Sequence, residues 1–287
     1  MFISGLSLGF VFVSPGPILF QLGPLIVRWY GLLVAVSVIL GVFLSQRLAK
    51  YRDVNPNLMS NLLIWLVVGA IPGARLYYVF FTWGAEFSYD GNILAIWKGG
   101  LAVHGAIFGG MLAAVLFAAY HKVSFWQLGD LVAPSLVLGQ AIGRWGCFFN
   151  NEAFGSPTNL PWKLFIPEIY RPEALKAFSY FHPTFFYESL WNFIVFGLLI
   201  ALFFQFPKAK TGTLILVYAI AYSLGRFWIE RLRVDSLMFG LFRMAQVVSL
   251  SLIILGGIGL WWLYGVGRSL PEVSEKSTKH INRENSN

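Results

Sequence analysis

The residues best suited to chemistry lie in the segment 143–155, where a long apolar run ends. This segment contains Arg144, Cys147 and Glu152, three polar groups that hydrocarbon solvates poorly. Ionisable residues at membrane depth are rare and usually face a cavity or a partner. An arginine can hold a phosphate or a carboxylate through two parallel hydrogen bonds. We therefore interpret the segment as an anion-binding site. The alternative is that Arg144 pairs with Glu152 or Asp130 and only joins helices.

Helical spacing places two sets of polar residues on one face each. The sets are Arg144, Cys147 and Asn151, and Tyr222, Arg226 and Glu230. Arg226 can pair with Glu230 along its own helix, but an exposed pair contributes only about 0.3–0.5 kcal/mol. That gain is small beside the cost of an arginine within an apolar span. One anion bound by both Arg144 and Arg226 would account for both cations.

Three further residues are candidates for binding or proton transfer. His104 is the histidine that falls within an apolar span, and its ordinary pKa of about 6.5 suits a general base. The alternative for His104 is a hydrogen bond that holds two helices together. Arg75 lies among helix breakers and either binds a lipid headgroup or pairs with a neighbouring carboxylate. Tyr30 follows Trp29 in a sequence typical of a membrane interface.

Composition places these residues in a membrane scaffold. The chain has 287 residues, of which 57% are hydrophobic and 12% charged, whereas soluble domains carry about 25% charged residues. Apolar runs of the roughly twenty residues that cross a bilayer recur, and the short alternating segments of a barrel do not. We therefore expect an all-α polytopic membrane protein. Net charge +8 then favours anionic lipid over nucleic acid as the partner.

The sequence gives no sign of a metal or disulfide framework. Cys147 is the single cysteine, which excludes an intrachain disulfide and a zinc site of paired cysteines. Neither HExxH nor a phosphate-cradling GxxxxGK[ST] occurs. We therefore expect no metal and no cofactor.

The chain divides into five parts. Residues 1–28 carry no charge before Arg28 and are broken by proline and glycine, so we expect an interfacial arm with a short helix over 2–13. Residues 29–149 hold four spans, 150–186 form a small periplasmic subdomain, 187–264 hold three more spans, and 265–287 form a disordered cytoplasmic tail. The predicted spans are about 29–46, 61–83, 99–120, 125–149, 185–206, 211–229 and 244–264.

Seven spans place the two termini on opposite sides of the membrane. One side gathers most of the cations, namely Arg47, Lys50, Arg52, Lys122, Lys208, Lys210 and the basic tail. The positive-inside rule makes that side cytoplasmic and the N-terminus periplasmic. Several cations, including Arg231, Arg233 and Arg243, fall on the outer side, which suggests an anionic substrate there.

At this point the residues resemble a known family, the bacterial prolipoprotein diacylglyceryl transferases. The resemblance covers about residues 14–264, and its motifs occur in the family's order. They are Gly143-Arg144-x-Gly-x-Phe-x-Asn150-x-Glu152-x-x-Gly155, Arg28-Trp29-Tyr30-Gly31-Leu32, Gly73-Ala74-Arg75, His104-Gly105, His182-Pro183-x-x-x-Tyr187-Glu188 and Tyr222-x-x-x-Arg226-x-x-x-Glu230. Many members have asparagine where this chain has Cys147, so a contact made by that amide would be altered here.

The resemblance implies a seven-span enzyme of the bacterial plasma (inner) membrane. Its substrates would be phosphatidylglycerol and the signal peptide of a preprolipoprotein with a lipobox cysteine. The products would be a thioether-linked diacylglyceryl group and glycerol phosphate. The acyl chains would extend into membrane lipid through a cavity that opens sideways between helices.

The same resemblance suggests roles for individual residues. Arg144 and Arg226 would bind the phosphate, and His104 would be the base, with Tyr222 as its rival or partner. Gly155 would permit a tight turn beside the site. The residues that would orient the headgroup or the arginines are Tyr30, Arg75, Asn150, Glu152 and Glu230. The competing class is a lipid or anion transporter with an intramembrane arginine site, although no internal repeat relates two halves of the chain.

Overall fold

A computed structural model describes residues 9–23, 25–82, 99–236, 238–239 and 242–265. The described part contains seven long helices that follow the predicted spans closely. They are α1 (Trp29–Tyr51), α2 (Asn57–Thr82), α4 (Val103–His121), α5 (Phe125–Phe149), α6 (Thr184–Gln205), α7 (Thr213–Ile229) and α8 (Met244–Gly265). Six are long and apolar enough to cross a membrane. The seventh, α5, carries Asp130 and Arg144. The prediction of a polytopic helical membrane protein is confirmed.

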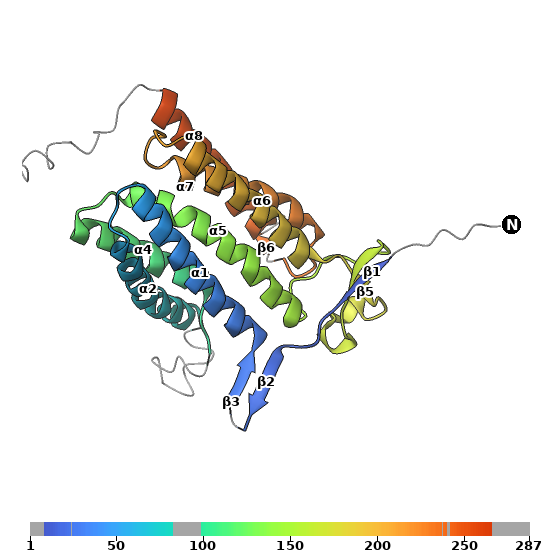
Figure 1. Cartoon of the computed structure of the whole chain (residues 1–287). Helices are drawn as coiled ribbons and strands as arrows, with labels where there is room; N and C mark the ends of the chain where they lie inside the picture. Colours follow the sequence, from blue (N-terminus) through green and yellow to red (C-terminus); the bar gives the residue numbers. More distant parts are fainter. Residues whose placement is uncertain (1–8, 24, 83–98, 237, 240–241, 266–287) are drawn as a thin grey trace, which may run out of the picture.

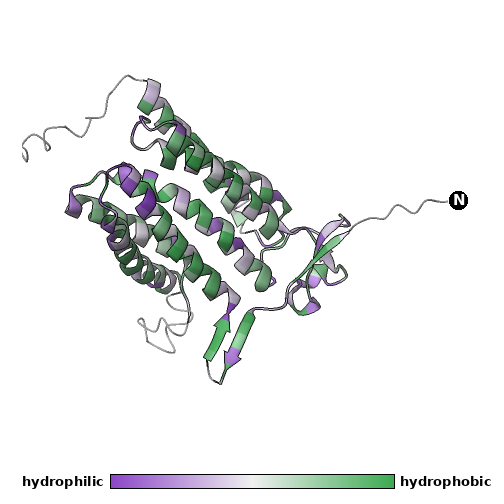
Figure 2. Ribbon diagram, viewed as in Figure 1, coloured by the Kyte–Doolittle hydropathy of each residue, from purple (hydrophilic) through white to green (hydrophobic). Residues whose placement is uncertain are grey.

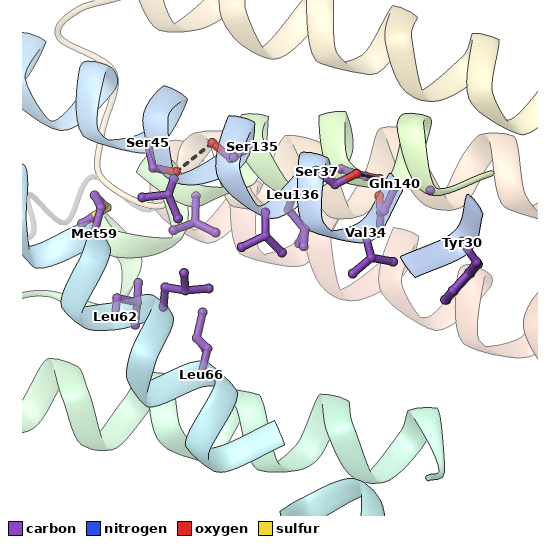
Figure 3. A pocket seen from close by; sticks show the side chains of 17 residues that line it. Tyr30, Val34, Ser37, Ser45, Met59, Leu62, Leu66, Ser135, Leu136 and Gln140 are labelled. Carbon is purple, nitrogen blue, oxygen red and sulfur yellow. Dashed lines mark hydrogen bonds between the residues drawn. The ribbon is translucent and has the colours of Figure 1, made fainter. Parts of the chain in front are cut away.

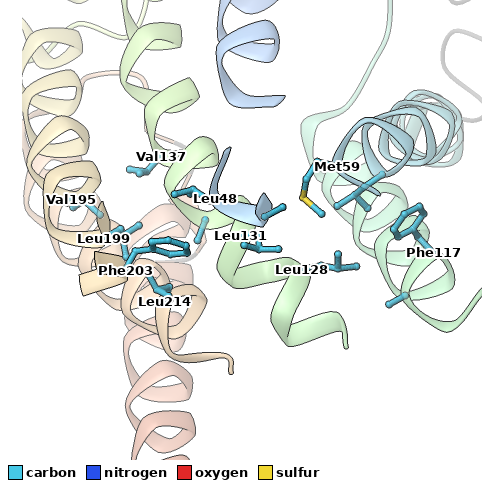
Figure 4. Close-up of a cluster of buried hydrophobic side chains, with 14 residues drawn as sticks. Leu48, Met59, Phe117, Leu128, Leu131, Val137, Val195, Leu199, Phe203 and Leu214 are labelled. Carbon is cyan, nitrogen blue, oxygen red and sulfur yellow. The ribbon is translucent and has the colours of Figure 1, made fainter. Parts of the chain in front are cut away.

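The helices form a layered bundle with α1 and α5 in the middle (Figure 1). The α2–α4 pair covers one side, and α6, α7 and α8 cover the other. The main core lies between these layers, where the side chains of Leu48, Met59, Leu131 and Leu199 are almost fully buried (Figure 4). This core fixes α5 as the helix that both outer layers contact.

The α2–α4 contact explains why helix breakers do not interrupt the second span. Pro72 lies inside α2, and the helix continues unbroken past it. Gly69 and Gly109 face each other so closely that a Cβ on Gly69 would lie 2.5 Å from the Gly109 carbonyl oxygen. Small residues at such contacts allow helices to approach in lipid, and neighbouring helices help to accommodate a proline.

The N-terminal arm consists of strands, so the prediction of a helix over 2–13 is wrong where the structure describes it. Strand β1 (Phe10–Val13) pairs in parallel with β4 (Trp162–Phe165), which pairs antiparallel with β5 (Tyr180–Phe181). Alternating phenylalanine and valine suit a strand once a partner is available. Strands β2 (Ile18–Leu22) and β3 (Leu25–Arg28) form a separate hairpin that projects beside the start of α1 (Figure 1). Residues 2–8 lie outside the described part.

The predicted subdomain at 150–186 is the partner of this arm, and we call the two together the head. It contains β4, β5 and the short helices η2 (Glu168–Tyr170) and η3 (Glu173–Leu175). Aromatic rings attach the head to the ends of α5 and α6: the ring centroid of Phe12 on β1 lies 5.4 Å from that of Phe185 and 6.4 Å from that of Phe148. Beyond α7 the chain forms η4 (Glu230–Leu232) and a short hairpin of β6 (Met238–Phe239) and β7 (Phe242–Arg243).

The end of the bundle opposite the head carries the short connections α1–α2, α4–α5 and α6–α7, together with the end of α8 (Figure 1). Hydrophilic residues gather at these connections and in the head, while the middle of the bundle is apolar (Figure 2). We call this the basic end because it carries Arg47, Lys50, Arg52, Lys122, Lys208 and Lys210. The predicted tail, apart from Gly265, lies outside the described residues.

A buried carboxylate joins α5 to α7 at the basic end. Asp130 of α5 accepts hydrogen bonds from the backbone N–H groups of Gly212, at 2.6 Å, and Ile215, at 2.9 Å. These amides belong to the N-terminal end of α7, where a carboxylate also interacts favourably with the helix dipole. Asp130 therefore caps a helix other than its own and fixes where α7 begins relative to α5.

We expect Asp130→Ala to lower the midpoint of thermal unfolding in detergent, because two buried amides lose their acceptor. An unpaired buried donor costs about 1–3 kcal/mol. Asp130→Asn should fall between wild type and Asp130→Ala, since its carbonyl can still accept one hydrogen bond. The matched control is Glu173→Ala, which removes an exposed carboxylate of the head. Equal midpoints for Asp130→Ala and Glu173→Ala would contradict the capping role.

Candidate active site

The centre of the site is the carboxylate of Glu188, the fifth residue of α6. Its side chain is 4% exposed, and Oε2 lies 2.7 Å from Nε of Arg144 on α5. Its other oxygen, Oε1, accepts a hydrogen bond of 2.7 Å from Nη1 of Arg226 on α7. Nη1 of Arg233 lies 3.5 Å from the same Oε1. One buried carboxylate thus brings arginines from three parts of the chain together.

A second carboxylate supports Arg226 from its own helix. Oε2 of Glu230 lies 2.6 Å from Nη2 of Arg226, and the Glu230 side chain is 2% exposed. This contact between Arg226 and Glu230 is close enough to be an ion pair, but its angle is not that of a hydrogen bond. Arg233 pairs in turn with Asp235, at 2.8 Å. Burial alone would lower the pKa of Arg233, but its carboxylate neighbours raise it on balance, so the guanidinium stays charged.

The six charged groups balance. Three guanidinium groups and three carboxylates give a net charge of zero for Arg144, Arg226, Arg233, Glu188, Glu230 and Asp235. Buried charges are stable only when they are paired. A phosphate that binds here must therefore share arginine donors with a carboxylate already present.

Hydrogen bonds and close packing fix the helices that carry these groups. Trp145 Nε1 donates to Ser189 Oγ at 3.1 Å, and Ser189 Oγ donates to the Ala141 carbonyl at 2.8 Å, which joins α5 to α6. Trp191 Nε1 donates to the Ala221 carbonyl at 2.9 Å, which joins α6 to α7. Gly225 makes room for this tryptophan, because a Cβ there would lie 2.1 Å from Cδ1 of Trp191.

Tyr222 and Cys147 complete the immediate surroundings of Arg144. Tyr222 interacts with the Arg144 guanidinium, and its ring stacks on that of Tyr218 with centroids 5.7 Å apart. Gln140 Nε2 donates to the Tyr218 hydroxyl at 2.8 Å. Cys147 also lies within electrostatic range of Arg144 and is partly buried. The structure therefore places a phenol and a thiol beside the cation.

The end of segment 143–155 differs from the expected helical face. Helix α5 stops at Phe149, and Asn151 has φ +56°, so Asn151 does not continue the face of Arg144. Asn150 Nδ2 donates to Oε1 of Glu152 at 3.2 Å. The alternative pairing of Arg144 with Glu152 or Asp130 is not the one found, because Arg144 pairs with Glu188 and Asp130 caps α7.

Gly155 is needed for close packing rather than for a turn. Its φ is not positive; Asn151 and Ala153 are the residues of this bend with left-handed backbone. A Cβ on Gly155 would lie 2.7 Å from Cβ of His182. The Gly155 N–H donates to the His182 carbonyl at 3.0 Å. Burial lowers the pKa of His182, which lies where the head meets α6.

An apolar pocket lies between α1, α2 and α5 (Figure 3). Its volume is about 380 Å³, and it extends from Tyr30 and Gly143 to Met59 and Ser45. The Tyr30 ring lies against Gly146, where a Cβ would come within 2.5 Å of the ring carbon Cδ2. Tyr30 thus stands between the segment 143–155 and the pocket. We call this pocket the groove.

Two predicted residues, His104 and Arg75, lie in the α2–α4 pair instead. The His104 side chain is exposed and its ring stacks on that of Tyr77, with centroids 5.9 Å apart. Arg75 is buried and donates from Nη1 to the carbonyls of Gly99, at 2.8 Å, and Gly100, at 3.2 Å. In the described ranges, His104 makes no hydrogen bond to the Glu188 cluster.

The sequence analysis missed Glu188 as a central residue. The sequence could have indicated this residue, because placing a carboxylate just inside an apolar span costs as much free energy as placing an arginine there. The proposed shared anion of Arg144 and Arg226 is in this structure the chain's own carboxylate. Among the residues that the structure describes, no group of three His, Cys, Asp or Glu side chains could hold a metal ion.

We expect Glu188→Ala to be strongly destabilising, because it leaves two partly buried arginines without their common partner. Removing one member of a buried ion pair costs about 3–5 kcal/mol. The measurement is the thermal unfolding midpoint in detergent. Glu188→Asp, which keeps the charge on a shorter side chain, should be intermediate. A midpoint for Glu188→Ala equal to that of Glu173→Ala would show that the cluster does not depend on Glu188.

Comparison with known proteins gives a consistent result over nearly the whole chain. The family model described as prolipoprotein diacylglyceryl transferase matches residues 17–262. Proteins named phosphatidylglycerol–prolipoprotein diacylglyceryl transferase are similar to it: that of Acaryochloris marina is 61% identical over 93% of this chain and 97% of its own length. That of Nostoc is 62% identical over 93% and 96%. That of Synechocystis is 56% identical over 92% and 95%. The chain therefore belongs to the prolipoprotein diacylglyceryl transferase family.

Proposed function

We propose that this protein transfers the diacylglyceryl group of phosphatidylglycerol to the lipobox cysteine of a preprolipoprotein. The cysteine sulfur forms a bond to the glyceryl carbon, the bond from that carbon to the phosphate oxygen breaks, and glycerol phosphate leaves. The thiol proton passes to a base. The observation that carries the proposal is the convergence of Arg144 and Arg226 on one buried carboxylate, in a chain of this family.

Arg144 and Arg226 would stabilise glycerol phosphate as it leaves. Negative charge grows on the phosphate ester as it leaves, and fixed cations in a poorly solvated site stabilise that charge. Arg144 meets Glu188 through Nε, so its terminal nitrogens can donate to phosphate oxygens. Arg226 is held by Glu188 and Glu230 on two sides and presents a fixed guanidinium. Glu230 therefore acts by orienting Arg226.

The base is either Tyr222 or His104. Tyr222 interacts with Arg144, so a proton accepted there would be close to the leaving phosphate. His104 is exposed on α4, and an imidazole is the side chain that most often accepts a proton in general-base catalysis. A peptide thiol that reaches His104 must approach from the α2–α4 side of the bundle. The two assignments therefore require different paths for the peptide.

The remaining predicted residues would bind the headgroup and the lipid. Tyr30 stands where the groove meets the segment 143–155, and Asn150 and Glu152 present polar groups at the head end of α5. Arg75 would contact a headgroup from the α2–α4 side, and Gly155 would keep the head tight against α6. The groove is apolar and begins beside Gly143, so it suits one acyl chain of phosphatidylglycerol.

The orientation follows from the two ends of the bundle. We assign the basic end to the cytoplasm and the head to the periplasm of a bacterial plasma membrane. The N-terminus is then periplasmic and the C-terminus cytoplasmic. The Glu188 cluster lies at the head end of α5, α6 and α7, on the side where the lipobox cysteine of a translocated preprolipoprotein arrives. Membrane lipid supplies the other substrate from the side.

The protein in detergent should release glycerol phosphate when given phosphatidylglycerol and a lipobox peptide. Arg144→Ala should lower this release at least about 100-fold, because it removes a donor to the developing charge. The matched control is Arg171→Ala, which removes a cation of the head that donates to two backbone carbonyls and lies over the Phe165 ring.

No peptide-dependent release from folded wild type would contradict the transferase. Lipid movement between leaflets without release would then favour the transporter. The variants His104→Gln and Tyr222→Phe separate the two bases, since loss of the base abolishes release at every pH at which the protein is folded.

Filling the groove should impair long-chain substrates selectively. We expect Val38→Trp to raise KM for dipalmitoyl phosphatidylglycerol while leaving the short dihexanoyl lipid nearly unaffected, because Val38 lines the groove. Val36→Trp is the control, since Val36 is similarly exposed on α1 and does not line the groove. An equal change for both lipids in Val38→Trp would indicate that the acyl chain lies elsewhere.

A further inference from the structure

A second pocket lies at the basic end, which is the opposite end of the bundle from the Glu188 cluster. Its volume is about 470 Å³, and it is enclosed by the end of α6, the α6–α7 connection, the start of α7 and the end of α8. Most of its wall is apolar, and none of its lining residues is acidic. The residues are Leu202, Gln205, Phe206, Pro207, Lys208, Ala209, Thr213, Leu214 and Tyr264.

Hydrogen bonds hold the walls of this pocket in place. The Tyr264 hydroxyl lies 2.7 Å from Thr213 Oγ1 and accepts a hydrogen bond of 3.1 Å from the Lys210 N–H, which joins α8 to α7. Lys210 Nζ donates to the Leu263 carbonyl at 2.8 Å. The Asp130 cap fixes the start of α7 behind them. The pocket is therefore largely preformed, as ligand sites usually are.

The charge beside the pocket is positive. Lys208 lines it, has an exposed side chain and forms no ion pair in the part of the chain that the structure describes. Arg52 approaches from α1 and donates to the Phe203 carbonyl at 3.2 Å and to that of Pro207. The nearby buried carboxylate, Asp130, is occupied by the backbone of α7. An apolar pocket with a cation at its mouth matches a lipid with an anionic headgroup.

We propose that this pocket binds an anionic phospholipid of the leaflet at the basic end. One acyl chain occupies the apolar part between Leu202, Leu214 and Tyr264, and the Lys208 ammonium binds the phosphate. Basic pockets between helices at the cytoplasmic face bind anionic headgroups in this way. The site is separate from the proposed transfer site, which lies at the other end of the bundle. The lipid would act there as a bound structural ligand rather than as a substrate.

The test measures lipid bound to the full chain in phosphatidylcholine nanodiscs by native mass spectrometry. The probe is phosphatidic acid, which is anionic and lacks the glycerol headgroup that the proposed transfer releases. We expect Lys208→Gln to weaken one class of bound phosphatidic acid about fivefold, the effect of one lysine near an anionic lipid. Lys208→Arg should retain binding. Lys122→Gln, an exposed lysine at the same end, is the control and should bind as wild type.

A second variant tests the acyl part of the site independently of charge. Leu202→Trp narrows the pocket and should reduce the same class of bound lipid, and inorganic phosphate should not displace that lipid. Phosphatidic acid binding to Lys208→Gln that equals binding to wild type would overturn the proposal. This is also the result expected if another part of this chain or a second copy fills the pocket. Lys208→Gln should release glycerol phosphate as wild type does, so failure of this site and failure of the proposed transfer are distinguishable.

Discussion

The structure depends on one buried carboxylate that three helices share. Glu188 of α6 forms ion pairs with Arg144 of α5 and Arg226 of α7, so none of the three helices can move alone without separating buried charges. In a poorly solvated interior an unpaired arginine is far more costly than the loss of an ordinary surface pair. The cluster therefore sets the positions of the helices and presents their cations at the same time.

A second carboxylate, Asp130, does the corresponding work at the other end of α5. Asp130 fixes the N-terminus of α7, whereas Glu188 fixes the C-terminal turn of the same helix by binding Arg226. Two polar contacts about four turns apart thus hold the register of α7 on α5. The apolar core between α1, α2, α5 and α6 supplies the area of contact, but hydrocarbon surfaces in lipid specify register weakly. The polar contacts supply the specificity that the site requires.

The sequence predicts the helices well because lipid imposes a simple rule of length and polarity. The bounds of α5 agree at both ends, and the proximity of Arg144 and Arg226 follows from the cost of two cations at membrane depth. Glu188 was not singled out because spacing along one helix does not tell which neighbour its face meets. Strand β1 was mistaken for part of a helix because its partner β4 lies about 150 residues further along the chain, beyond any local pattern.

That long-range pairing has a consequence for how the protein is made. The residues of β1 are synthesised first, yet their strand partner appears only after α1, α2, α4 and α5 have been made. Contacts so distant in sequence form late, because the intervening chain must be ordered before they can close. The N-terminal strand must therefore stay unpaired until these four helices have been made. When β1 pairs with β4, the N-terminal residues become part of the sheet in the head.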